Sequence, residues 1–206
     1  MKRLVLYIHG KDGSAGEGVH YRPLFPGCEV TGLDYRSATP WGAGKEIRDA
    51  AERLKGEYGR ITLIANSIGA YFSMNAGIDG LLDKAYFISP VVDMERLILE
   101  LMNRAGVTEE RLRERGVIST AFGEELSWAY LRFAREHSVT WKVPTEILYG
   151  EGDTLTPYET VAAFAKAHGA GLTVMKKGEH WFHTQEQMRF LDGWIKRSES
   201  GEGEDT

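Results

Sequence analysis

The chain has 206 residues, 42% hydrophobic and 27% charged, which fits one folded domain with a sizeable core. The formal net charge is −5, and four acids near the C-terminus account for most of it: Glu199, Glu202, Glu204 and Asp205. The remaining body is close to neutral, which argues against nucleic acid as the main partner because no basic surplus is left to neutralise phosphates. The single cysteine, Cys28, excludes an internal disulfide and a cysteine metal cluster.

Targeting signals are not evident in the sequence. No apolar run approaches the length of a membrane span, and Met1-Lys2-Arg3 leads directly into an apolar, strand-like run instead of a signal peptide. We therefore expect a cytoplasmic protein with no membrane partner. Nothing in the sequence implies a metal or an organic cofactor.

A buried strand is predicted at residues 4–8, and a glycine-rich segment, 9–18, follows it. A phosphate loop would need Ser or Thr after Gly10-Lys11, where Asp12 stands, and the G-x-G-x-x-G spacing of a dinucleotide fingerprint is missing. The third interpretation is an oxyanion loop of the form H-G-x-x-G, in which the backbone amide of Lys11 faces a nucleophile. For His9 we expect a hydrogen bond that fixes the loop.

The next elements are a strand at 30–35 and a helix that begins after Thr39-Pro40, an N-cap followed by proline at the first helical position. Its buried face is predicted by an i, i+3, i+4, i+7 spacing: Ile47, Ala50, Ala51 and Leu54. We expect this helix to end near Gly56.

The segment 60–70 changes from an apolar, β-branched run into a helix-compatible stretch at Ala65-Asn66-Ser67-Ile68-Gly69. This pattern is the G-x-S-x-G of a nucleophile elbow, with alanine in place of the first glycine. Small residues allow a sharp strand-to-helix reversal, which exposes the serine hydroxyl and points the helix N-terminus, including the amide of Ile68, toward it. The alternative is an ordinary turn that happens to contain a serine.

Downstream, a strand is predicted at 85–89 and is stopped by Pro90. Residues 91–141 carry no strong strand signal and show helical patterns, including Thr108 as the cap of a helix over 109–115. About fifty residues exceed an ordinary connection, so we interpret this segment as a helical insertion over one end of the sheet.

Two further strands are predicted at 145–150 and 171–175, and each leads into a polar loop that contains Asp153 or His180. Thr156 and Thr184 each begin a capping-box pattern that predicts a helix. The acidic tail, residues 198–206, is expected to be disordered.

Alternating strands and helices predict a mainly parallel sheet with helices on both faces, and ligands gather at the carboxyl ends of such strands. Ser67, Asp153 and His180 each follow a different strand, in the chain order of a Ser–Asp–His triad. A serine hydroxyl needs a base, which His180 can supply, while Asp153 would fix the imidazole tautomer. Asp93 is the rival acid, or alternatively a helix N-cap, and His183 is the rival base.

Together, His9-Gly10, Ala65 to Gly69, Tyr149 to Asp153 and Gly178 to His180 resemble the small serine hydrolases of the α/β-hydrolase superfamily. With the elements placed above, we expect an α/β-hydrolase fold of about six strands flanked by helices, in one domain over 1–197. The helical insertion, 92–141, would be a lid inserted before the fifth strand. The sequence departs from the family at Ala65 and in the few residues before the first strand, so we expect a smaller sheet.

The expected activity is that of an esterase-like serine hydrolase, which cleaves a small ester or thioester through an acyl-enzyme. Its triad would be Ser67, His180 and Asp153, and the amides of Lys11 and Ile68 would hold the oxyanion. Two alternatives remain open: an amidase or peptidase with the same triad, and a binding protein on this fold with the triad unused. Trp181 and Phe182 are interpreted either as core residues or as the lining of an acyl pocket.

Overall fold

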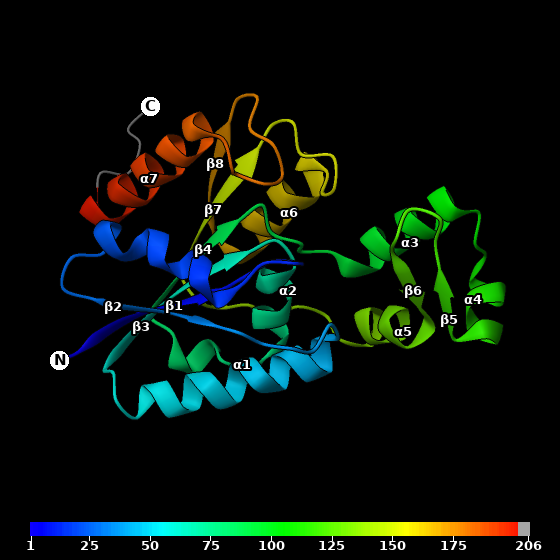
Figure 1. Ribbon diagram of the computed structural model, residues 1–206, viewed down its shortest axis with the longest axis horizontal. Coiled ribbons are helices and arrows are strands. Elements are labelled where there is room, and N and C mark those ends of the chain that lie inside the picture. Colours follow the sequence, from blue (N-terminus) through cyan, green and yellow to red (C-terminus); the bar gives the residue numbers. More distant parts are fainter. Residues whose placement is uncertain (202–206) are drawn as a thin grey trace. The chain divides into compact units, whose positions relative to one another are not determined.

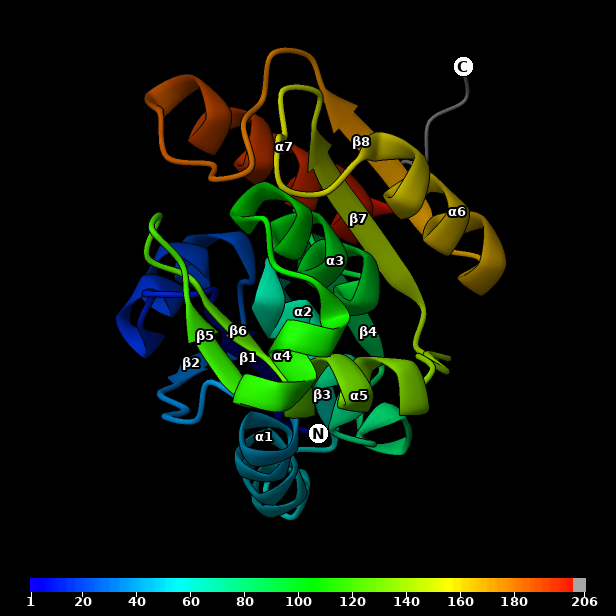
Figure 2. The same cartoon turned by 90° about the vertical axis from the view of Figure 1, so that its right-hand side faces the viewer.

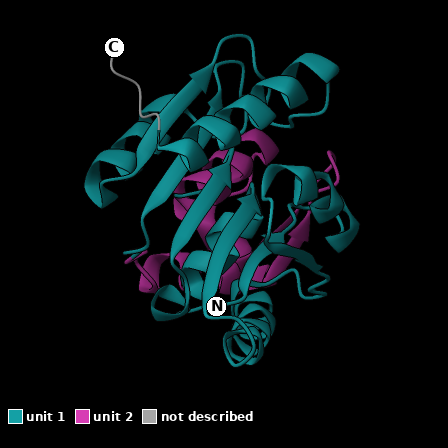
Figure 3. Ribbon diagram, turned by 90° about the vertical axis from the view of Figure 1, so that its left-hand side faces the viewer, with its two compact units in different colours: residues 1–92, 141–206 teal, residues 93–140 magenta. Residues whose placement is uncertain are grey.

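The computed structural model describes residues 1–201, and the chain divides into two compact units. One unit consists of residues 1–92 together with the chain from 141 onward, and the other of residues 93–140 (Figure 3). The first unit contains the sheet, and each unit is described separately below.

A parallel sheet forms the centre of the first unit. Within the described residues its six strands are β1 (Arg3–Ile8), β2 (Glu29–Leu33), β3 (Arg60–Asn66), β4 (Lys84–Ile88), β7 (Thr145–Gly150) and β8 (Gly171–Met175). Their order is β2-β1-β3-β4-β7-β8, and every neighbouring pair is parallel. The predicted mainly parallel sheet is therefore confirmed.

Helices cover both faces of this sheet (Figure 1). They are η1 (Ala15–Leu24, a 3₁₀-helix), α1 (Pro40–Lys55), α2 (Ile68–Asn75), η2 (Asp79–Leu81, also 3₁₀), α6 (Tyr158–His168) and α7 (Gln185–Ser200). Figure 1 shows η1 and α7 on one side of the strands and α1 and α2 on the other. Under η1 and α7 lies a core of alternate strand residues and helix residues, including Val5, Tyr7, Ile64, Tyr86, Leu148, Tyr21, Leu191 and Trp194. Because helices bury both faces of the sheet, the strand sequences are nearly continuous apolar runs.

Two of the predicted helix starts are confirmed by their caps. The Thr39 hydroxyl accepts a hydrogen bond from the Gly42 amide at 3.3 Å, and the C-cap of α1 is Gly56, as expected. Thr184 forms the predicted capping box with Gln187 at the start of α7.

The capping box predicted at Thr156 is wrong. α6 begins at Tyr158 after Pro157, and no side chain caps it. Thr156 is instead buried in the loop before the helix, where its amide donates to Asp153 Oδ1 and its carbonyl accepts from the Tyr149 hydroxyl. These contacts within the same loop hold Thr156 ahead of the helix, so the local capping signal is not used.

The second unit contains α3 (Met94–Ala105), α4 (Glu109–Arg115), β5 (Val117–Ser119), β6 (Glu125–Ser127) and α5 (Trp128–Glu136). Thr108 caps α4 as predicted, with its hydroxyl 3.2 Å from the Arg111 amide. The antiparallel hairpin β5–β6 was not predicted, because strands of three residues are too short to show a period in the sequence. The role of this unit as a lid stays a prediction.

The C-terminal boundary also differs from the prediction. Residues 198–200, expected to be disordered, belong to α7. Lys84 Nζ donates to the Ser198 carbonyl at 2.9 Å, and the Tyr86 hydroxyl donates to Glu199 Oε1 at 2.6 Å. These bonds to β4 hold the last turn of the helix, and the rest of the predicted tail, 202–206, lies outside the described residues. Among residues 1–201, no helix combines the length and apolarity needed to cross a bilayer.

Candidate active site

Three side chains from separate loops meet in the first unit. Ser67 Oγ lies 2.8 Å from His180 Nε2, and His180 Nδ1 lies 2.6 Å from Asp153 Oδ2. A carboxylate only accepts hydrogen bonds, so Nδ1 carries the proton, and in the neutral ring Nε2 is left as an acceptor. The serine hydroxyl therefore donates to a nitrogen that can take its proton.

The backbone at Ser67 adopts a strained turn between β3 and α2. Its φ is +50° and its ψ is −119°, a backbone region that residues other than glycine rarely occupy. The turn is held from β4 and the segment after it, because the Ser67 amide donates to the Ile88 carbonyl at 3.0 Å and the Ser67 carbonyl accepts from Val91 at 3.1 Å. α2 begins at Ile68, so the amide of Ile68 is among the helix N–H groups that lack an intrahelical partner.

The glycine-rich loop after β1 lies directly against this turn. A Cβ added at Gly69 would be 2.4 Å from the His9 carbonyl oxygen, so no larger residue fits there. A Cβ at Gly10 would be 3.4 Å from Ser67 Cβ. Lys11 follows Gly10 immediately, so the segment expected to carry the second oxyanion donor lies beside Ser67.

Asp153 is held as a buried hydrogen-bond acceptor. Its side chain is 0% exposed, and Oδ1 accepts from the amides of Leu155 at 2.7 Å and Thr156 at 3.0 Å while Oδ2 faces His180. The carboxylate is thereby fixed in one orientation before any substrate arrives, and a buried carboxylate with these partners is compensated for its lost hydration.

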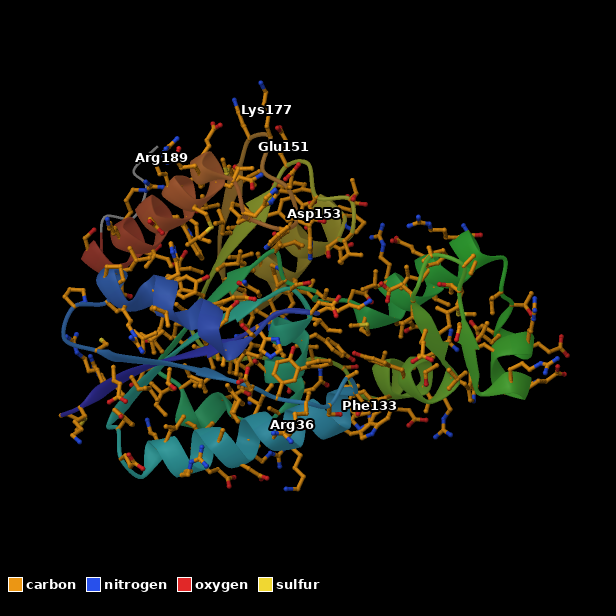
Figure 4. The ribbon with its side chains drawn as sticks, viewed as in Figure 1. Arg36, Phe133, Glu151, Asp153, Lys177 and Arg189 are labelled. Carbon is orange, nitrogen blue, oxygen red and sulfur yellow. The ribbon has the colours of Figure 1, made fainter. Side chains whose placement is uncertain are left out.

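The loops that carry Asp153 and His180 are joined through their backbones and lie side by side (Figure 2). The Gly152 amide donates to the Gly178 carbonyl at 2.7 Å, and the Lys177 amide donates to Glu151 Oε2 at 3.0 Å. Figure 4 labels Glu151, Asp153 and Lys177 in this pair of loops. This pairing keeps the acid beside the imidazole.

Gly150, the last residue of β7, lies against the backbone of the loop that carries His180, and substituting it should have a large effect. A Cβ at this position would lie 2.5 Å from the Glu179 carbonyl and 2.6 Å from the Gly178 carbonyl. Gly150→Ala should therefore lower the free energy of unfolding by about 1–3 kcal/mol through overpacking. Urea denaturation measures this change. The control is Gly80→Ala, since Gly80 has no atom within 4 Å of an added Cβ, and equal stability of the two variants would contradict the account.

The rival residues occupy other positions. Asp93 caps α3 in the second unit, with Oδ1 2.9 Å from the Arg96 amide. His183 Nδ1 lies 2.8 Å from the Trp181 carbonyl, and its ring stacks on that of Trp181. His9 makes the expected kind of loop contact, with Nδ1 2.7 Å from the Gly10 carbonyl.

Trp181 and Phe182 differ in burial. The side chain of Phe182 packs in the core under α7, whereas Trp181, which follows His180 directly, is 70% exposed. Only Trp181 is therefore open to a ligand.

Ionisation of Tyr149 should lower the free energy of unfolding at alkaline pH. Burial, then the charges of Asp153 and Glu159, raise its pKa from 10.0 to about 12. The folded state thus holds the phenolic proton more tightly, so its stabilising effect is complete below pH 10 and is lost as pH rises toward 12.

The matched comparison is with Tyr149→Phe. We expect the stability advantage of the wild type over this variant to shrink by up to about 1.4 kcal/mol per pH unit above pH 10, measured by urea denaturation. A difference in stability that stays constant from pH 9 to pH 12 would contradict this assignment.

Sequence reasoning missed the contacts that hold the glycine-rich loop from below. The Tyr7 hydroxyl accepts from Asn66 Nδ2 and donates to Glu17, and the Tyr35 hydroxyl donates to the His9 carbonyl. Asn66 belongs to the elbow motif and Glu17 to the glycine-rich segment, but neither motif indicates a bond to Tyr7. The pairing becomes visible only when β1, β2 and β3 are placed next to one another.

Comparisons with known proteins find similarity in structure alone. No protein-family model matches the chain, and no curated protein matches it in sequence. Est1E from Butyrivibrio proteoclasticus superposes with a TM-score of 0.76 at 20% identity, over 97% of this chain and 88% of its own.

Two further solved structures are similar over most of their length. Alpha/beta hydrolase domain-containing protein 10 from mouse has a TM-score of 0.69 at 13% identity, over 97% of this chain and 90% of its own. An esterase from Pyrobaculum calidifontis has a TM-score of 0.65 at 19% identity, over 97% of this chain and 77% of its own. At such identities the likeness concerns the fold, and the chemistry has to be argued from the residues of the site.

Proposed function

We propose that this chain, which has the α/β-hydrolase fold, is a serine hydrolase that cleaves a small ester or thioester through an acyl-enzyme. The observation that carries the proposal is the hydrogen-bonded series from Ser67 Oγ through His180 to the buried carboxylate of Asp153. A serine in an ordinary turn needs neither a hydrogen bond from its hydroxyl to a histidine nor a backbone with positive φ.

In the first step His180 Nε2 takes the Ser67 proton as Oγ attacks the substrate carbonyl carbon. The carbonyl π electrons move to its oxygen, and the amides of Lys11 and Ile68 would stabilise the resulting charge. Asp153 keeps Nδ1 protonated and stabilises the imidazolium. The tetrahedral intermediate then collapses, and His180 returns its proton to the departing alcohol or thiol.

Water completes the cycle. His180 removes a proton from a water molecule that attacks the acyl-enzyme carbonyl, and the second tetrahedral intermediate releases the carboxylic acid and regenerates the Ser67 hydroxyl. No redox step occurs, and the net reaction consumes one water. The same residues can cleave an amide, so the leaving group has to be found by experiment. An ester is the first choice because one structural neighbour is named an esterase.

The test is a panel of p-nitrophenyl esters of short and long acyl chains, acyl thioesters and aminoacyl amides, each with wild type and Ser67→Ala. We expect turnover of esters or thioesters that is lost in the variant. Turnover confined to the amides would favour a peptidase or amidase. Tight binding of a small metabolite with no turnover would favour a binding protein and contradict the proposal.

A further inference from the structure

The two halves of the proposed oxyanion site come from different parts of the chain. Ile68 begins α2 after β3, while Lys11 lies in the glycine-rich loop after β1. Donors for a developing negative charge act only if their separation is fixed before the reaction, because reorganisation during the reaction removes the benefit. Some group must therefore hold the loop at a set distance from the elbow.

The Glu17 carboxylate contacts the glycine-rich loop at Gly13 and Ser14. Glu17 Oε1 accepts from the Ser14 amide at 3.0 Å, and a Cβ placed on Gly13 would be 2.9 Å from the same oxygen. Asp34 Oδ1 accepts from the Ala15 amide at 2.8 Å and supports the same stretch. The Glu17 side chain therefore packs against the turn that follows Lys11.

The Tyr7 hydroxyl connects this carboxylate to the nucleophile elbow. It donates to Glu17 Oε2 at 2.5 Å and accepts from Asn66 Nδ2 at 2.9 Å, and Asn66 immediately precedes Ser67. Tyr7 lies on β1 in the middle of the core and is 0% exposed. Burial raises its pKa, so the hydroxyl remains a donor across the working pH range.

We propose that Tyr7 and Glu17 are positioning residues that set the distance between the two oxyanion donors. The inference rests on the proposed function, and it assigns a role to two side chains that touch neither the triad nor the substrate. The route runs from the elbow through Asn66 to Tyr7, then to Glu17, then to the backbone of the oxyanion loop.

The chain offers a matched control at Tyr58. Its hydroxyl also donates to a carboxylate at 2.5 Å, that of Glu29, and the ring is also buried. Glu29 begins β2 and is at the opposite end of that strand from the glycine-rich loop. Tyr58→Phe thus removes the same kind of contact at a place where the proposal assigns no effect on turnover.

The experiment compares Tyr7→Phe, Glu17→Gln and Tyr58→Phe with the wild type on the best ester from the panel. For the first two we expect kcat to fall about 10- to 100-fold with KM little changed, because a donor displaced by a fraction of an ångström stabilises the transition state less. Affinity for a trifluoromethyl ketone, which forms a tetrahedral adduct on serine, should fall in parallel. Tyr58→Phe should keep the wild-type values.

Several outcomes would overturn the inference. Wild-type kcat and ketone affinity in Tyr7→Phe would do so, and so would an equal loss in Tyr58→Phe, since that indicates general damage. If Tyr7→Phe fails to fold, the Glu17→Gln variant alone provides the test, because Glu17 is exposed and its substitution should be tolerated. Circular dichroism checks that this variant is folded. If the wild type shows no turnover that depends on Ser67, the proposed function fails first and this inference with it.

Discussion

Replacing His180 with alanine should lower kcat/KM by about 10⁴- to 10⁶-fold, since in the proposed mechanism the imidazole accepts the serine proton. Ser67 Oγ has its hydrogen bond to Nε2 of this ring, and without it the hydroxyl stays protonated and unreactive. Initial rates on the best ester of the panel measure the loss.

The control for this prediction is His183→Ala. His183 is three residues away, but its Nδ1 bonds to the Trp181 carbonyl and its ring stacks on Trp181. This variant should keep most of its activity. If it loses as much activity as His180→Ala, or if His180→Ala remains active, the assignment of the base is wrong.

Replacing Asp153 with asparagine should lower kcat by about 10⁴-fold while preserving the shape of the site. The asparagine amide cannot accept from Nδ1 and from the amides of Leu155 and Thr156 at once, so the imidazole loses the acceptor that fixes its tautomer. Steady-state kinetics at several pH values measures both the loss and any change in the pH profile.

Asp93→Asn is the matched comparison, because it makes the same chemical change at the other candidate acid. Asp93 caps α3, and asparagine is an equally good N-cap, so this variant should keep its stability and its activity. A large loss of activity in Asp93→Asn, with Asp153→Asn near wild type, would exchange the roles assigned to the two acids.

The convergence of Ser67, Asp153 and His180 was predictable because it depends on topology. Each residue follows a strand, and in a parallel sheet the carboxyl ends of the strands lie along one edge. The small residue Gly69 reinforced the prediction, since it marks a close backbone approach that the structure contains, whereas the equally close approach at Gly150 was not predicted.

Other features could not be predicted because they depend on which groups the folded backbone brings into contact. The capping signal at Thr156 is real in isolation, but Tyr149 and Asp153 use its backbone groups instead. In the same way, the residues that fix the glycine-rich loop are Tyr7 on β1 and Glu17 in η1. The capping-box spacing from Ser14 to Glu17 marks the start of η1 but does not indicate the bond from Tyr7. Local sequence therefore indicated the reacting groups, and tertiary packing determined what holds them.

The most direct test of the central claim is reaction of the native protein with a fluorophosphonate, followed by peptide mapping by mass spectrometry. We expect a single adduct on the Ser67 hydroxyl, formed quickly in wild type, slowly in His180→Ala and not at all in Ser67→Ala. Absence of labelling in the folded wild-type protein, or equal labelling after Ser67→Ala, would contradict the claim that this serine is an activated nucleophile.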